Sequence, residues 1–385
     1  MTEFNNQNQV FSESDIDSDD ITISELEEDD LKIEERDIHE PFDPTKIRVA
    51  TRPMTIDLVL DRIEHDEINL APDFQRYANI WDDQAQSLLI ESILIRIPLP
   101  AFYMDATDED HWLVIDGLQR LSTLKKFILD QKLKLTRLEF LTNLEDKNYD
   151  ELPRNYQRRI KETVLNVYLI EKGTPPEVKF NIFRRINTGG EPLSPQELRH
   201  ALNPGKATKF LDRLAKSQEF IEITNLGKKR KQRMDDHEFV LGFVAFSLTP
   251  YHKYPVKKGR DYFLNEAMIK INKMDNSMEQ EVENKFQYAM KAASDIFGDS
   301  AFRKMSRKNR KYPINKALFE AWSVTLSQLN SQELEILKTK SKILKDKFIE
   351  QMEKDKDFLA SISQAANKVE YRFMTIEQIV QEVLL

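Results

Sequence analysis

The segment Trp112–Leu124, which reads WLVIDGLQRLSTL, constrains the fold more than any other part of the chain. Its apolar first half predicts a short buried strand, and apolar residues at helical spacing begin directly after Asp116 and Gly117. The first turn of such a helix has unpaired backbone N–H groups and favours an anion such as phosphate, whose charge Arg120 would match. The alternative for a junction of this kind, taken alone, is a plain connection with no binding role.

Composition limits the classes of protein to which the chain can belong. Its 385 residues predict two or three domains, and the absence of cysteine excludes disulfides and thiolate metal sites. The sequence shows no apolar run near the roughly 18 residues of a membrane span, and its acidic start lacks the apolar core of a signal peptide. We therefore expect a cytoplasmic protein with no membrane segment.

Charge is distributed unevenly along the chain. Residues 1–45 contain 16 Asp and Glu against two basic residues, a net charge of −14, so the remainder must carry +5 to give the total of −9. Two basic runs, 228–233 and 303–311, could contact nucleic-acid phosphates. The alternative for each run is a solvated loop or helix face.

The acidic N-terminal segment predicts a disordered tail, because it has too little apolar surface to offset the entropy of ordering. We expect residues 1–45 to form no domain. One hypothesis is that this tail competes with nucleic acid for the basic body of the chain. A tail that only improves solubility is the plainer alternative.

Residues 46–205 mix helical and strand signals. Thr55 can begin a helix that runs towards Glu64, and Asp82 is a candidate N-cap for the next helix. The further expected elements are an extended segment at 68–70 and strands at 101–104, 112–115 and 164–170.

A second local signal lies between Phe180 and Leu202. Apolar residues at helical spacing predict a helix that is broken at Asn187-Thr188-Gly189-Gly190. Ser194-Pro195-Gln196-Glu197 then has the pattern of a capping box, with Ser at N-cap, Pro at N1 and Glu at N3. A new helix is expected to begin there.

The chain after residue 205 shows long helical patterns and few strand signals. Helices are expected at 239–246, 282–297, 314–329, 334–352 and 376–384. The predicted organisation is a disordered tail at 1–45, a mixed α+β domain at 46–205 and an all-helical domain at 206–385.

Three separated motifs in one order point to a known family. They are Phe74-Gln75-Arg76 with Trp81 five residues on, DGLQRLSTL at 116–124, and FRRINTGGEPLSPQELRHAL at 183–202. Together they resemble the N-terminal domain of GmrSD-type restriction endonucleases, whose fold is similar to the ParB/sulfiredoxin superfamily. The resemblance covers roughly residues 50–205, and the three motifs together are far more specific than any one of them.

The resemblance implies a nucleotide-binding, often nucleotide-hydrolysing module of a prokaryotic restriction or antiviral defence system that acts on foreign DNA. The family's central motif is DGQQR, and Leu118 replaces its first Gln, a departure that bears on hydrolysis more than on binding. The implied cofactors are a nucleoside triphosphate and Mg²⁺. By resemblance, Asp116 holds the metal or positions water, Gly117 gives backbone access, and Gln119 and Arg120 contact phosphate. Gln75 and Arg76 would face the same pocket, and Asn187 could meet a ligand there. The alternatives are that Arg76 only pairs with an acidic residue and that the turn after Asn187 is a simple helix C-cap.

Two alternatives stay open. One is a metal-dependent DNA nuclease, for which Asp73, Asp82 and Asp116 are candidates only because they flank the motifs. The other is a non-enzymatic DNA-binding adaptor that uses the basic runs. Relatives often carry an HNH nuclease domain, and residues 206–385 show no match to one, so the resemblance also implies a stand-alone module with an effector protein as a possible partner beside DNA.

Overall fold

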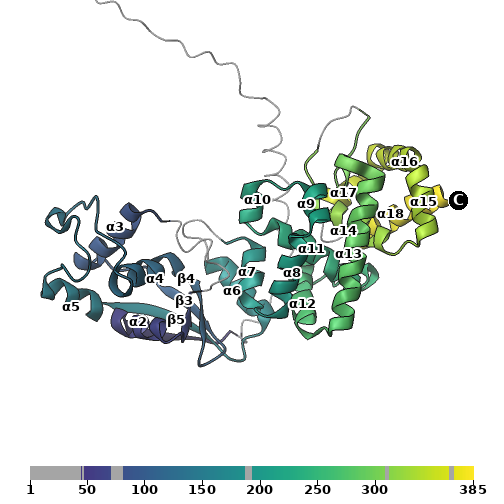
Figure 1. Cartoon of the computed structure of the whole chain (residues 1–385). Coiled ribbons are helices and arrows are strands. Elements are labelled where there is room, and N and C mark those ends of the chain that lie inside the picture. Colours follow the sequence, from purple (N-terminus) through teal and green to yellow (C-terminus); the bar gives the residue numbers. More distant parts are fainter. Residues whose placement is uncertain (1–44, 46, 71–80, 187–192, 308–311, 364–367) are drawn as a thin grey trace, which may run out of the picture.

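The computed structural model describes residues 45, 47–70, 81–186, 193–307, 312–363 and 368–385. Figure 1 shows two regions side by side, a sheet with its helices at one end of the molecule and a helical bundle at the other. Helices α6 (Pro176–Ile186) and α7 (Pro195–Leu202) lie between them. The mixed α+β class with an all-helical C-terminal region is therefore confirmed.

A five-stranded mixed sheet organises the N-terminal region. Its strands, in the spatial order β1-β5-β3-β4-β2, pair antiparallel, parallel, antiparallel and parallel. Their bounds are β1 (Val49–Thr55), β2 (Ile68–Asn69), β3 (Phe102–Ala106), β4 (Trp112–Asp116) and β5 (Val164–Glu171). The strands expected near 101, 112 and 164 are thus present, and the extended segment at 68 is the short strand β2.

Strand β1 was not predicted from the sequence. It lies at one edge of the sheet and contains Pro53, which pairs with Asn166. A proline cannot donate a hydrogen bond to a β-ladder, so Pro53 argues against a strand in the sequence. It is tolerated here because β1 is an edge strand.

Helices cover the two faces of the sheet unequally. Alternate residues of β5, among them Leu165 and Val167, pack into one core with α2 (Ile56–Glu64), α3 (Asp83–Leu94), α4 (Leu118–Leu124) and α5 (Arg154–Glu162). On the other face Ile115 and Ile170 form a smaller cluster with α6 and α7. Helix α7 therefore meets the sheet directly.

The local helix signals of the sequence are confirmed. The side chains of Thr55 and Asp82 cap α2 and α3 by accepting from backbone N–H groups three residues on. The capping box of α7 is complete, since Ser194 Oγ accepts from the Glu197 N–H at 3.1 Å and the Glu197 side chain returns to the Ser194 N–H.

Among the described residues, the C-terminal region has helices and connecting loops and no named strand, apart from an isolated β-bridge between Arg303 and Ile314. Its α-helices are α8 (Lys206–Ala215), α9 (Gln218–Thr224), α10 (Lys228–Gln232), α11 (Asp235–Leu248), α12 (Gly259–Lys273), α13 (Asn276–Phe297), α14 (Lys316–Ser327), α15 (Ser331–Thr339), α16 (Ser341–Lys354), α17 (Lys356–Ser363) and α18 (Val369–Leu384). The single helix expected at 334–352 is wrong, because the chain turns at Lys340 and forms α15 and α16. That turn lets both short helices pack against α18.

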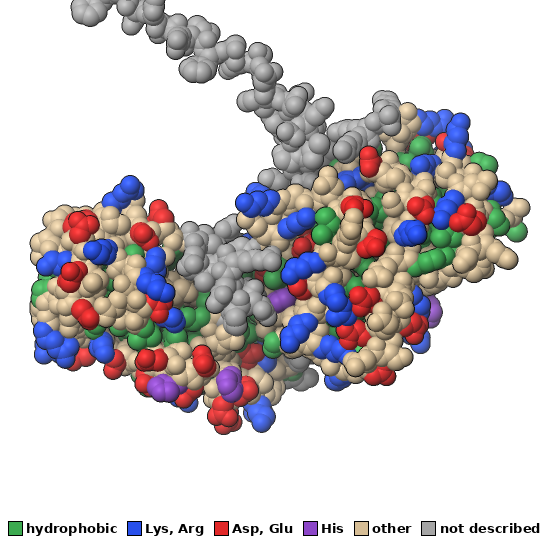
Figure 2. All heavy atoms as spheres, viewed as in Figure 1, with side chains coloured by type: hydrophobic (Ala, Val, Ile, Leu, Met, Phe, Trp, Pro, Cys, Tyr) green, Lys and Arg blue, Asp and Glu red, His purple; other side chains and the backbone are tan. Residues whose placement is uncertain are grey.

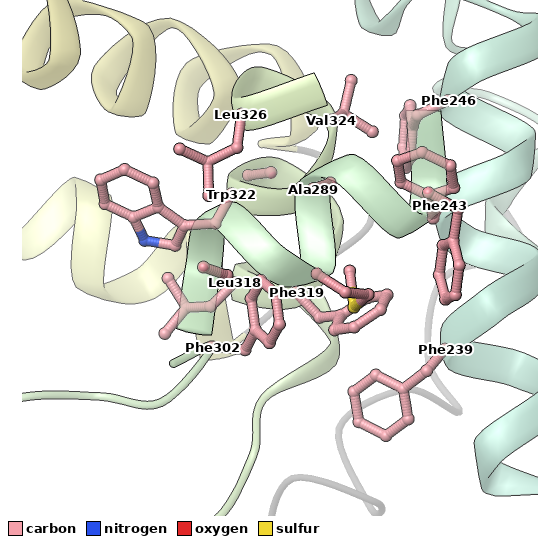
Figure 3. Close-up of a cluster of buried hydrophobic side chains, with 14 of the residues drawn as sticks. Phe239, Phe243, Phe246, Ala289, Phe302, Leu318, Phe319, Trp322, Val324 and Leu326 are labelled. Carbon is pink, nitrogen blue, oxygen red and sulfur yellow. The ribbon is translucent and has the colours of Figure 1, made fainter. Parts of the chain in front are cut away.

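Aromatic side chains fill the core of this bundle, as Figure 3 shows. Phe239 and Phe302 approach the ring of Phe319 with centroids 5.2 Å and 4.6 Å away, and Trp322 continues the cluster towards α16. The Phe and Trp residues of this region are therefore core residues.

Candidate functional site

The junction between β4 and α4 has the geometry that the sequence predicts. Gly117 caps α4 with a φ of +99°, in the left-handed region that favours glycine. A Cβ at this position would lie 2.3 Å from Phe102 Cδ1, so no larger residue fits without moving the ring. Glycine lets the chain turn tightly here and leaves the first turn of α4 without a side-chain cap.

Asp116 and Arg120 form an ion pair at this junction. Arg120 Nη2 lies 2.9 Å from Asp116 Oδ2 and donates to the Ala101 carbonyl at 3.1 Å, while Nη1 donates to the Pro100 carbonyl. The guanidinium also lies 4.3 Å from the centre of the Phe102 ring. Arg120 is therefore buried and held from several sides, whereas Asp116 is about one quarter exposed.

Burial controls the ionisation of this junction. It raises the pKa of the Asp116 carboxyl, although the charge of Arg120 and the Gly117 N–H oppose the shift. Burial also raises the pKa of Tyr103, the register partner of Asp116, and the neighbouring Tyr168 and Asp116 add to that shift. The Tyr103 ring stacks on Tyr168 with centroids 5.0 Å apart.

Two polar side chains of α4 are half-buried, and each has one shielded oxygen without a partner. Gln119 Oε1 and Ser122 Oγ are shielded from solvent and have no hydrogen-bond partner among the described residues. The two residues are three apart, so they lie on one face of the helix. Because a buried polar atom without a partner costs free energy, this face of α4 is a candidate ligand surface, although Arg62 Nε in the same region is also without a partner among the described residues.

Four of the predicted site residues, Asp116, Gly117, Gln119 and Arg120, lie within the described residues, and their closeness already follows from their places in the sequence. The other three, Gln75, Arg76 and Asn187, lie outside the described residues, as does the nuclease candidate Asp73. Asp82 caps α3 through a 2.8 Å bond from the Ala85 N–H, which explains that residue without a metal.

The described half of the third motif has a role that the sequence did not predict. Arg199 of α7 is 1% exposed and reaches into the helical bundle, where it lies 3.1 Å from Glu238 and 2.7 Å from Asp261. Arg184 of α6 joins the same Asp261 at 3.3 Å. This motif therefore fastens the sheet region to the bundle.

A family comparison agrees with the motifs. Residues 57–203 match the model described as the N-terminal domain of the GmrSD restriction endonuclease. Residues 57–203 are called the GmrSD N-terminal domain below, after this match. No curated protein matches the chain.

The GmrSD N-terminal domain of this chain contains the whole Asp116–Arg120 junction and ends within the turn after α7. Leu118, the departure from DGQQR, packs with Leu113 and Leu193 around Ala201 of α7. An apolar side chain at 118 thus joins the site helix to the helix that enters the bundle. The DGLQR motif alone does not predict this contact between Leu118 and α7.

The donor set restricts what the site could hold. Across the described part of the chain, no group of three or more His, Cys, Asp or Glu residues is placed to bind a metal ion. Among the described residues, Asp116 therefore belongs to no such cluster. None of the described helices is long and apolar enough to cross a membrane.

Proposed function

We propose that this chain is a nucleotide-dependent module of a restriction or defence system that acts on DNA, and that its nucleotide binds at the Asp116–Arg120 junction. The family match supports the system and its DNA target. The observation that carries the site is the buried Gln119 Oε1 without a partner, on the first turn of the helix that follows the Asp116-Gly117 turn.

The backbone favours an anion at this place. The first-turn N–H groups of α4 have no side-chain cap, and η3 (Lys125–Leu129), a π-helical turn, extends the helix at its other end. The Phe102 ring occupies the position of a Gly117 side chain, so a phosphate would have to reach the first-turn N–H groups of α4 from another side. The negative charge of Asp116, next to it, is balanced by Arg120.

The chemistry of Gln119 refines the role that the family resemblance implies. An amide oxygen accepts hydrogen bonds, so Gln119 Oε1 cannot bond an ionised phosphate oxygen. Its partner in the complex would be a donor, such as a ribose hydroxyl, a base N–H or a water molecule. Only the amide nitrogen of Gln119 is suited to phosphate.

In this proposal, Arg120 does not contact phosphate directly. Its donors already bond Asp116 and the carbonyls of Pro100 and Ala101. In this proposal Arg120 orients Asp116 and adds positive charge beneath the phosphates. Substituting Arg120 would disturb the fold as well as the site, so it is a poor first test.

Mg²⁺ fits this donor set as an ion shared with the nucleotide. Mg²⁺ commonly binds through one or two carboxylates together with substrate phosphates, and Asp116 can give one carboxylate. When bound, the ion would neutralise phosphate charge. Asp116 must be ionised to hold it, and burial acts against that ionised form.

The test is calorimetric titration of the full chain with each of the four ribonucleoside triphosphates in Mg²⁺, with phosphate release measured in parallel. Gln119→Met keeps the side-chain length and removes the carboxamide, and Gln280→Met changes an exposed glutamine of α13 as the matched control. We expect at least about tenfold weaker nucleotide binding in Gln119→Met and wild-type binding in the control, since about 1.4 kcal/mol corresponds to a factor of ten. Equal affinity in all three proteins would reject the site.

A further inference from the structure

The basic run at 228–233 forms a short exposed helix, α10, which contributes no buried side chain to the core. A five-residue helix without buried residues gains little from packing, so contacts at its ends must hold it. Figure 1 shows α10 above α7, and Figure 2 shows Lys and Arg side chains gathered at the same place. The run is therefore presented at the surface beside the GmrSD N-terminal domain.

Two arginines attach α10 to the body of the protein. Arg230 Nε lies 2.6 Å from Asp235 Oδ2, and the guanidinium lies 5.5 Å from the centre of the Phe239 ring. Arg233 Nη1 lies 3.6 Å from Glu197 Oε2 of α7. Two acidic groups next to the helix, Asp235 and Glu197, are thus paired with arginines of the basic run.

A hydrogen bond joins α10 to the third motif as well. Ser194 Oγ, the cap of α7, donates to the Arg233 carbonyl at 2.8 Å. The end of α10 is therefore fixed against the first turn of α7, whose Ala201 contacts Leu118 of the site helix. A ligand on α10 would lie beside the elements that carry the proposed nucleotide site.

The three lysines of α10 have no acidic partner among the described residues. Lys228 and Lys229 are exposed and Lys231 is half-buried, and no acidic side chain among the described residues pairs with any of them. Lys228 and Lys231 are three residues apart and share one face. Their positive charge is uncompensated within the described part of the protein.

We infer that α10 is a docking helix for the phosphate backbone of duplex DNA, a conclusion that rests on the proposed action on DNA and adds the surface that contacts it. The helix reads KKRKQ and offers no aromatic side chain on which an unstacked base could lie, so single strands are not its ligand. It also has no apolar side chain to insert into a lipid surface. Lysine contacts to phosphate position DNA without reading its sequence.

The experiment measures fluorescence anisotropy of a labelled DNA duplex with the full chain at several salt concentrations. The variant carries Lys228→Gln, Lys229→Gln and Lys231→Gln, and the control carries Lys132→Gln, Lys134→Gln and Lys342→Gln, two exposed lysines of the sheet region and one of α16. Each lost phosphate contact lowers the slope of log K against log salt by about 0.9. The expected loss of slope in the α10 variant is therefore about 2–3, with at least about tenfold weaker binding at 0.1 M salt and no change in the control.

Two further arms separate this inference from the proposed nucleotide site. Nucleotide titration of the α10 variant is expected to match wild type, and single-stranded DNA is expected to bind more weakly than duplex DNA. An unchanged salt slope in the α10 variant, or tighter binding of single strands through the same lysines, would overturn the docking helix. If the α10 variant shows the smaller salt slope but wild type binds no nucleotide, the DNA-docking role of α10 would stand and the proposed nucleotide site would be rejected.

Discussion

Helix α4, which carries the proposed site, and helix α7, which joins the sheet region to the bundle, differ in whether particular buried polar groups have partners. On α4, Gln119 Oε1 and Ser122 Oγ are shielded with no partner among the described residues. On α7, the charge of Arg199 is just as buried but has both Glu238 and Asp261 within 3.1 Å. The difference holds for the Arg199 charge and not for every group of α7, because Gln196 Nε2 of that helix is also shielded without a hydrogen-bond partner among the described residues.

The joint between the sheet region and the bundle extends well beyond α7. Glu238 is also contacted by Arg260 and Lys316, and Arg260 continues to Glu320, which Arg372 of α18 meets at 2.7 Å. The three cations around Glu238 hold the pKa of its carboxyl far below the ordinary range despite complete burial, which acts in the other direction. Ion pairs therefore link the GmrSD N-terminal domain to the last helix of the chain.

Removing one partner from this network is expected to give the largest effect. Arg199→Ala leaves Glu238 buried with fewer positive neighbours, and breaking a buried pair in this way costs about 3–5 kcal/mol of unfolding free energy. Urea denaturation measures the loss. Arg213→Ala removes an exposed pair with Glu279 and Glu283 and should cost less than about 1 kcal/mol. Equal losses of unfolding free energy in the two variants would show that the buried ion pairs of Arg199 stabilise the protein no more than an exposed pair does.

The turn at the site should be the next most sensitive position. Gly117→Ala places a side chain at a φ of +99° and against the Phe102 ring. The strained backbone alone costs about 1–3 kcal/mol, and displacement of the ring adds to it. Urea denaturation is again the measurement, and Gly227→Ala, where a Cβ would meet nothing within 4 Å, is the control. A variant as stable as wild type would contradict the close contact.

Among the described residues, Glu91 is a buried carboxylate of the sheet region that is stabilised by backbone N–H groups and not by an ion pair. Glu91 accepts backbone N–H bonds from Glu139, Phe140 and Leu141 at 3.0, 2.7 and 2.7 Å. Although its burial acts in the opposite direction, these donors lower its pKa below the ordinary 4.5. Glu91→Gln is expected to cost about 1–3 kcal/mol at neutral pH.

The sign of the pH dependence follows from the lowered pKa. The stabilisation by Glu91 is complete above the unfolded pKa of 4.5 and is lost as pH falls through the lower folded pKa. The gap in unfolding free energy between wild type and Glu91→Gln should therefore narrow from pH 7 towards pH 3. The exposed Glu139→Gln serves as control. A gap that widens in acid would refute this account of Glu91.

The smallest effect on stability is expected at the site helix. Because Gln119 Oε1 and Ser122 Oγ are buried without partners, Gln119→Met and Ser122→Ala should leave the unfolding free energy unchanged or raise it by up to about 1 kcal/mol. The same protein samples should bind nucleotide more weakly. A stability loss above about 1 kcal/mol would mean that these side chains support the fold, and the contrast with α7 would disappear.

Local signals carried most of what the sequence could predict. The caps at Thr55, Asp82 and Ser194 and the Asp116-Gly117 turn depend on neighbours within a few residues, and each was found where expected. The central-motif residues lie at this turn, as their places in the sequence require, and their roles in binding stay predictions.

Features that depend on distant parts of the chain were not predictable in the same way. Arg199 meets Asp261 across 62 positions, and nothing near Arg199 in the sequence marks it as buried. Strand β1 pairs with the distant strand β5, and the two helices on either side of the turn at Lys340 both contact α18. The orphaned oxygen of Gln119 likewise results from the packing around α4.

The most direct test of the nucleotide site is titration of wild type and Asp116→Asn with nucleoside triphosphates, with and without Mg²⁺, each protein first shown to be folded by urea denaturation. We predict that Mg²⁺ strengthens binding to wild type and loses that effect in Asp116→Asn, because the variant retains the Gly117 turn but lacks the carboxylate. Equal stimulation by Mg²⁺ in both proteins, or no nucleotide binding by folded wild type, would contradict the account.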